Sequence, residues 1–205
     1  MANTQVQFGF QPYGIESGIA PNFGLRRRQI AYNYGTALFR GDPVVSLNTG
    51  YIAAVSSQSA PLAGIFWGCE YTTNSPLTAL PVKSRYWPGV ALSSSSIVVT
   101  AWIIDDPNEQ FLVASLGSTA AISTANIMNN VQWNAGAGGN TATGISSYVI
   151  DDGNITTTST LPFKIIDLYS NFAPPGQNGA DNTTVYNWAI VKMNNTDRAA
   201  GTTGV

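Results

Sequence analysis

The chain contains no histidine, a single cysteine and few charged side chains. Charged residues make up 10% of its 205 positions, and residues 111–150 include no Asp, Glu, Lys or Arg. Histidine is the usual proton shuttle near neutral pH and the commonest metal ligand. The lone Cys69 excludes a disulfide within the chain and a zinc site built from several Cys or His ligands. We therefore expect no enzyme activity, no metal and no cofactor, and a chain suited to packing and docking.

The remaining composition is that of a folded protein. Hydrophobic residues make up 44% and aromatic residues 11% of the chain, enough for a sizeable core. A net charge of −2 argues against general nucleic-acid binding, and it gives little repulsion against self-association. The first residues lack the pattern of a signal peptide, and no apolar run is long enough to span a membrane. We expect synthesis in a cytoplasm and no membrane partner.

Residues 1–35 differ in pattern from the rest of the chain. They place aromatic residues beside glycines, as at Phe8, Phe10, Tyr13 and Phe23, with neither helical nor strand periodicity. Such a segment cannot bury its aromatic rings within itself. An extended arm that lies on its own domain or on another subunit would cover them. We interpret residues 1–35 as an N-terminal docking arm and residues 36–205 as a β-rich body.

Short apolar segments between turn signals predict an antiparallel β-sandwich or barrel for this body, of a jelly-roll-like kind. The expected strands are residues 43–47, 51–55, 63–71, 80–82, 90–92, 97–104, 110–114, 145–150, 162–168 and 185–193. Residues 48–50 predict a three-residue hairpin loop, residues 105–108 and 151–154 predict turns, and residues 120–131 predict a short helix. The serines at 93–96 form either a polar loop, which we favour, or a linker between two lobes.

Two candidate sites have simpler interpretations. The adjacent aspartates at 105–106 and 151–152 are the nearest approach to paired catalytic carboxylates. Neighbouring residues of a strand point to opposite faces, and both pairs lie in turn-forming sequence, so we interpret them as turn residues. The Arg-Gly-Asp sequence at residues 40–42 matches an integrin-binding tripeptide, but three residues carry little specificity. We interpret it as a chance match.

The arginine run at residues 26–28 is the only basic cluster of the chain. Its guanidinium groups could bind carboxylates of a neighbouring subunit, remain solvated, or grip nucleic-acid phosphates. Because the whole chain is acidic, we rank protein docking first, solvation second and nucleic acid third.

The five tryptophans divide into two groups. Trp67, Trp102 and Trp188 lie inside apolar strands, where core packing is expected. Trp87 and Trp133 lie in more polar sequence and are better candidates for a surface contact. The full set of candidate partner-binding residues is Phe8, Phe10, Tyr13, Phe23, Arg26, Arg27, Arg28, Trp87 and Trp133.

Several segments, in order along most of the chain, together carry a resemblance to a known class of protein. They are Met1-Ala2-Asn3, residues 41–45 with the hairpin at Gly50, and residues 63–68, 106–111 and 162–168 ahead of Trp188. In these segments the chain resembles the auxiliary head proteins of tailed bacteriophages, the capsid decoration or cement proteins.

This resemblance implies a β-rich structural protein, often trimeric, that binds the outer surface of a phage head at junctions between major capsid subunits. Its partners would be the major capsid protein and copies of itself as a homo-oligomer, without direct contact to nucleic acid. Its location would be the virion, after synthesis in the host cytoplasm. Attachment at several points of a lattice turns weak contacts into tight retention. The alternative is a glycan- or receptor-binding β module of a virion fibre, in which Trp87 and Trp133 stack on sugars.

Overall fold

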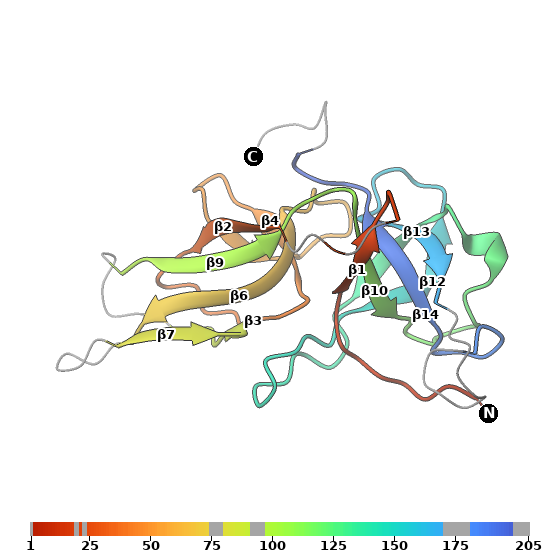
Figure 1. Ribbon diagram of the computed structural model, residues 1–205, viewed down its shortest axis with the longest axis horizontal. Coiled ribbons are helices and arrows are strands. Elements are labelled where there is room, and N and C mark those ends of the chain that lie inside the picture. The colour runs from red at the N-terminus through yellow and green to blue at the C-terminus, as the bar shows by residue number, and fades with distance from the viewer. Residues whose placement is uncertain are drawn as a thin grey trace.

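The computed structural model describes residues 2–18, 21, 24–73, 80–90, 97–169 and 181–198. The fold consists of two six-stranded antiparallel sheets and one two-stranded pair, arranged as two lobes (Figure 1). Within these residues the only helical element is one 3₁₀ turn, η1 (Thr124–Asn126). The mainly β, antiparallel, sandwich-like architecture confirms the predicted fold class.

The first sheet, sheet A, has the strand order β1-β10-β14-β13-β11-β12. Its strands are β1 (Gln11–Ile15), β10 (Glu109–Ala114), β11 (Asn130–Asn134), β12 (Val149–Thr156), β13 (Phe163–Leu168) and β14 (Trp188–Met193). An isolated bridge between Ser115 and Ile150 joins the end of β10 to β12. The sheet therefore curls, and its edge strand β12 returns toward its second strand.

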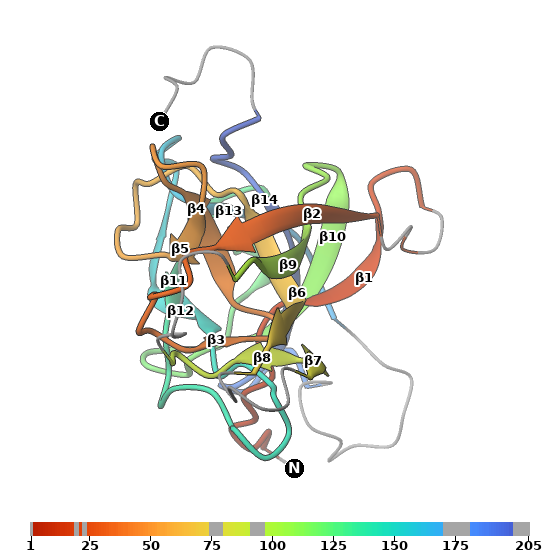
Figure 2. The ribbon, with the colours of Figure 1, turned by 90° about the vertical axis from the view of Figure 1, so that its left-hand side faces the viewer.

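The second sheet, sheet B, has the order β2-β9-β6-β4-β5, with β7 paired to the far end of β6. Its strands are β2 (Leu25–Ile30), β4 (Pro43–Ser46), β5 (Ile52–Ala54), β6 (Gly64–Thr72), β7 (Pro81–Ser84) and β9 (Val99–Ile104). A separate pair, β3 (Leu38–Phe39) and β8 (Tyr86–Trp87), closes one side of this lobe (Figure 2). The predicted hairpin between β4 and β5 is confirmed, with Gly50 in the left-handed region at φ +84°.

Residues 2–15 and 24–35 are built into the body. Strand β1 pairs with β10, and β2 pairs with β9 over its whole length. The side chain of Asn3 donates to the carbonyl oxygen of Asp181 at 2.8 Å, and the Phe8 ring packs edge-on against Trp188. The segment thus lies on its own domain, which is the first of the two arrangements considered for an arm.

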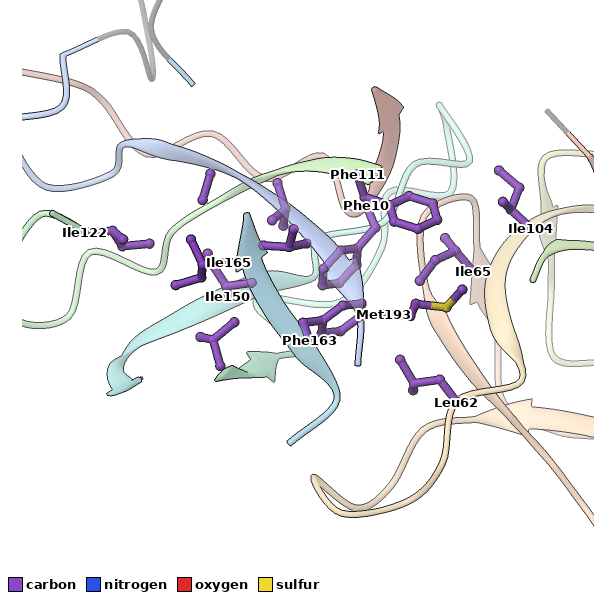
Figure 3. Packing of buried hydrophobic residues seen from close by; sticks show 14 of the residues in the cluster. Phe10, Leu62, Ile65, Ile104, Phe111, Ile122, Ile150, Phe163, Ile165 and Met193 are labelled. Carbon is purple, nitrogen blue, oxygen red and sulfur yellow. The ribbon is translucent and has the colours of Figure 1, made fainter. Parts of the chain in front are cut away.

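Two hydrophobic clusters hold the lobes. The larger cluster consists mainly of side chains from the strands of sheet A. It extends from Ile122 at one end to Ile65 and Ile104 of sheet B at the other (Figure 3). The second cluster lies between sheet B and the β3–β8 pair, around Phe66 and Trp87. Because strands β6 and β9 contribute to both clusters, burial of apolar surface joins the two lobes as well as filling each.

Two local expectations were wrong and one was confirmed. Only η1 is helical within residues 120–131, because β11 begins at Asn130. Residues 151–154 lie inside β12 rather than in a turn. The predicted turn at residues 105–108 is confirmed, with the Glu109 N–H donating to the Asp106 carbonyl oxygen, and there the chain passes from sheet B to sheet A. Residues 93–96 lie outside the described residues, but their flanking strands belong to one lobe.

Replacing Phe10 tests whether the N-terminal segment is part of the core. The Phe10 ring is fully buried and stacks on Phe163 with ring centroids 4.2 Å apart. We expect Phe10→Ala to lower the free energy of unfolding by about 3–5 kcal/mol, measured by urea denaturation. Tyr13→Ala, at a side chain that is 45% exposed, should change it far less. If Phe10→Ala left the free energy of unfolding unchanged, the N-terminal segment would not be part of the core.

Candidate functional site

Strand β2 divides the arginine run between two faces of sheet B. Side chains alternate along a strand, so Arg26 and Arg28 share one face and Arg27 lies on the other. Arg27 is registered opposite Trp102 of β9 and donates from Nη2 to Thr100 Oγ1 at 3.1 Å. The three arginines therefore do not form one patch.

Asp105, directly after β9, gathers three guanidinium groups. Its Oδ2 lies 2.6 Å from Arg26 Nε and 3.8 Å from Arg28 Nη2. Its Oδ1 lies 3.1 Å from Arg198 Nη1, which also donates to the Asp105 carbonyl oxygen. The Asp105 side chain is only 6% exposed, whereas the arginines reach solvent. The carboxylate is thus a structural anchor that fixes cations at the surface.

A cleft of about 720 Å³ opens beside this anchor. Its lining residues are Gly24, Leu25, Arg26, Arg27, Asp105, Asp106, Pro107, Asn108 and Arg198. Three guanidinium groups face two carboxylates there, so the cleft carries a net positive charge. Leu25 contributes an apolar side chain that is 43% exposed. An apolar contact beside directional cations is a combination that suits an acidic protein surface.

The aromatic candidates of the N-terminal segment have different environments. Phe10 belongs to the core and is not a surface anchor, so that expectation was wrong. Phe8 is half-buried against Trp188, and Tyr13 remains exposed with its ring edge-on to Tyr169. Phe23 lies outside the described residues.

The two tryptophans predicted to be exposed differ in their burial. Trp87 is fully buried, because β8 pairs with β3 and the indole Nε1–H donates to the Tyr34 carbonyl oxygen at 2.9 Å. Trp133 lies on β11 and packs against the larger cluster, with its ring 5.4 Å from that of Tyr148. The expectation of a surface contact was therefore wrong for Trp87, whereas the half-buried Trp133 remains a predicted contact residue.

All three tryptophans expected in the core are half-buried instead. Trp67 and Trp102 line a hollow on the outer face of sheet B. The apolar run at residues 97–104 is typical of a strand that is buried on both faces, so the sequence did not predict that one face is partly exposed. The signal that could have revealed it is the alternation of Val99, Ala101 and Ile103, all in the second cluster, with Trp102 between them.

The aspartates of β12 organise a neighbouring loop. The carboxylate of Asp152 accepts hydrogen bonds from the backbone N–H groups of Ser118 and Thr119, each at 3.0 Å, and from their hydroxyls. Burial alone would raise the pKa of Asp152, but these hydrogen bonds together outweigh it and lower the pKa below its ordinary value. The pair at 151–152 thus has a structural role in the fold.

The Arg-Gly-Asp sequence forms an interior turn. Asp42 is buried, and its Oδ2 accepts a hydrogen bond from the Phe39 N–H at 2.8 Å. Burial raises the pKa of Asp42 to about 6, although hydrogen bonds from Phe39 and the Ser146 side chain act in the opposite direction. The carboxylate is closed off from a receptor, in agreement with the interpretation of a chance match.

Other reactive groups are enclosed or dispersed. Cys69 is buried, and burial raises the pKa of its thiol to about 12, so it is a poor nucleophile. In the described part of the chain, no group of three or more His, Cys, Asp or Glu is placed to hold a metal ion. Over the same residues, no helix has the length and apolar character needed to cross a bilayer.

Comparisons of the chain with protein-family models, with curated proteins and with solved structures find no significant match.

The Asp105 anchor predicts a stability difference between two kinds of ion pair. We expect Asp105→Ala to lower the free energy of unfolding by about 1–3 kcal/mol, because a buried acceptor of several charged donors is lost. Glu16 pairs with Lys192 at 2.7 Å but is largely exposed, so Glu16→Ala should cost at most about 1 kcal/mol. Urea denaturation of both variants checks this. Equal effects would mean that the three arginines are simply solvated.

Asp42 and Asp152 predict pH effects of opposite sign. The raised pKa of Asp42 means that the folded state holds the proton more tightly between the ordinary value of 3.8 and about 6. The stability of the native chain relative to Asp42→Asn should therefore fall as pH rises through this range. The lowered pKa of Asp152 reverses the sign, so stability relative to Asp152→Asn should fall as pH drops below 3.8. Denaturant titrations of the native chain and each variant over a range of pH measure both differences in unfolding free energy. A difference that does not change with pH would contradict the pKa shift assigned to that aspartate.

Proposed function

We propose that the chain is a structural protein of a tailed-bacteriophage head that binds the outer surface of the capsid and stabilises the lattice of major capsid subunits. The virion role is supported by the resemblance of the segments around Gly50, Trp67 and residues 162–168 to decoration proteins. The partners are the major capsid protein and copies of this chain.

The observation that carries a docking role is the cleft beside β2. There Arg26 and Arg198 are held in place by a buried carboxylate, and the half-exposed Leu25 lies beside them. Guanidinium groups fixed by Asp105 lose less conformational entropy on binding than free side chains would. Acidic residues on a capsid subunit would complement the excess positive charge, and Leu25 would contribute apolar area.

Docking energy then comes from several weak contacts. A cleft of this size buries too little surface for tight binding by itself, but attachment at several points of a lattice raises the effective concentration of each contact. Ionic contacts at the rim weaken with salt, whereas the apolar contact does not. Retention on the capsid should therefore fall with ionic strength without being abolished.

Leu25→Ser tests the cleft without removing strands, since deletion of the first 30 residues would take β1 and β2 away. Purified chain is mixed with capsids assembled from the major capsid protein encoded in the same genome, and bound protein is measured by co-sedimentation. We expect saturable binding that Leu25→Ser weakens by about tenfold, corresponding to roughly 1.4 kcal/mol.

Leu47→Ser is the matched control, because Leu47 is also half-exposed but lies at the β4–β5 hairpin. It should bind as the native chain does. Absence of native binding at any salt concentration would refute the capsid role. Native binding that Leu25→Ser leaves unchanged would refute the cleft as the docking site.

A further inference from the structure

The outer face of sheet B presents a tryptophan whose strand neighbours are an arginine and a glycine. On β9 the residues Val99, Ala101 and Ile103 enter the second cluster, so Thr100 and Trp102 lie on the opposite face. The strands β2, β9, β6 and β7 lie side by side here (Figure 1). Trp102 is registered between Arg27 and Gly68, and Thr100 between Gln29 and Glu70, with Glu70 opposite Lys83. We call this surface the Trp102 face.

Two hollows adjoin on the Trp102 face, and the Trp102 side chain lines both. One, of about 410 Å³, is lined by Trp67, Gly68, Cys69, Lys83, Ser84, Arg85 and Trp102. The other, of about 370 Å³, is lined by Arg27, Glu70, Tyr71, Thr72, Pro81, Val98, Thr100 and Trp102. The first depends on Gly68, where a Cβ atom would lie only 2.9 Å from the Ser84 carbonyl oxygen. An elongated ligand could therefore occupy both hollows across one indole.

Among the residues that the structure describes, the face carries more positive than negative groups. Lys83 and Glu70 largely offset each other at 3.9 Å. Arg85 lies within 4 Å of no carboxylate among the described residues. Its neighbour Arg40 stacks over the Trp67 ring at 3.3 Å from the centroid. Burial, and secondarily repulsion from Arg85, lower the pKa of Arg40.

In the described part of the chain, neither Arg85 nor its neighbour Arg40 has a carboxylate within 4 Å, and two such guanidinium groups indicate a place for an anion. Their mutual repulsion is unfavourable in the empty protein and would be relieved by a bound negative group. Arg40 is held by its stacking on Trp67, so Arg85 is the cation that reaches the hollow. A carboxylate, sulfate or phosphate there would accept directional hydrogen bonds from the Arg85 fork.

The remaining lining favours a sugar over a peptide strand. A peptide that adds to a sheet does so at an edge, where backbone groups are unpaired, whereas the strands under the Trp102 face are paired to one another. The polar groups around the indole are the hydroxyls of Thr100 and Ser84, which both donate and accept, and the Glu70 carboxylate, which accepts. A pyranose ring has an apolar face that matches an indole and hydroxyl groups at its edge that match this rim.

We propose that the Trp102 face binds an acidic saccharide, with a sugar ring against the Trp102 indole and a negatively charged group held by Arg85. Arg27 and Glu70 bind the next residue of the saccharide in the second hollow. Trp67, fixed under Arg40, forms the wall of the first hollow. The site lies on the opposite face of β2 from Arg26 and Arg28, and it does not depend on the proposed capsid role.

The test measures binding of oligosaccharides to the purified full-length chain by isothermal titration calorimetry. The probes are an oligogalacturonate, a sulfated heparin oligosaccharide and a phosphate-bearing teichoic-acid fragment, with a neutral cello-oligosaccharide of equal length for comparison. We expect at least one acidic probe to bind with a dissociation constant below about 1 mM and the neutral probe to bind at least tenfold more weakly. Which acidic probe binds identifies the anionic group.

Three variants locate the site. Trp102→Ala and Arg85→Ala should each weaken binding of the acidic probe by about tenfold or more, and Trp102→Phe should retain part of it because a ring remains. Met128→Ala, at an exposed side chain of the other lobe, is the control and should bind normally. Denaturation curves and near-UV circular dichroism establish that each variant is folded.

Several results would overturn the proposal. These are no binding of any acidic saccharide in this range, equal binding of the neutral probe, or tighter binding of poly-glutamate or single-stranded DNA. Acidic binding that folded Trp102→Ala and Arg85→Ala leave unchanged would place the saccharide elsewhere. Because no capsid is present in this assay, its failure would leave the docking cleft at Leu25 unaffected.

Discussion

The turn at residues 39–42 is the constraint on which the two-lobed structure depends. The Gly41 N–H donates to the Phe66 carbonyl oxygen and its own carbonyl oxygen accepts from the Phe10 N–H, while the Asp42 carbonyl oxygen accepts from the Phe66 N–H. Arg40 exchanges backbone hydrogen bonds with the loop at 144–146. Buried backbone groups must be paired. The turn at residues 39–42 can therefore form its hydrogen bonds only when the N-terminal segment, β6 and this loop are all in their native positions. Gly41 has φ +97°, and a Cβ there would lie 3.0 Å from the Phe10 nitrogen, which explains the glycine.

The few charged residues of this chain mostly organise its own structure. Asp42 closes the turn, Asp105 gathers arginines, and Asp152 fixes a loop, each through hydrogen bonds or ion pairs to nearby groups. A buried carboxylate is stable only where donors replace its lost water. More of the acidic than of the basic side chains are therefore buried, with hydrogen bonds or ion pairs to groups of the chain itself. Guanidinium groups with exposed ends remain at the surface, and a weakly acidic chain acquires locally positive faces.

These positive surfaces share strand β2, and Arg27 lines both of them. Alternation along β2 sends Arg26 and Arg28 toward Asp105 and sends Arg27 toward Trp102. The cleft at the start of β2 adds an apolar leucine to anchored cations. The Trp102 face adds indole faces and hydroxyl groups to Arg85, which has no carboxylate within 4 Å among the described residues. Their different chemistry supports different ligands, a protein surface for the cleft and a charged sugar for the Trp102 face. A single basic run can thus contribute to separate binding sites.

The sequence by itself determined the β class, the hairpin at Gly50 and the strands around Phe66, Phe111 and Phe163, because turn residues and apolar runs act locally. It also located the basic run and the scarcity of charge. Only the tertiary structure decided which tryptophans are covered: Trp87 is buried by β3 and Tyr34, whereas Trp102 is half-buried and lines a hollow on the outer face of sheet B. It likewise placed Phe10 in the core and Asp105 among its arginines. These outcomes depend on strand pairings distant in sequence, such as β2 with β9, which no local pattern encodes.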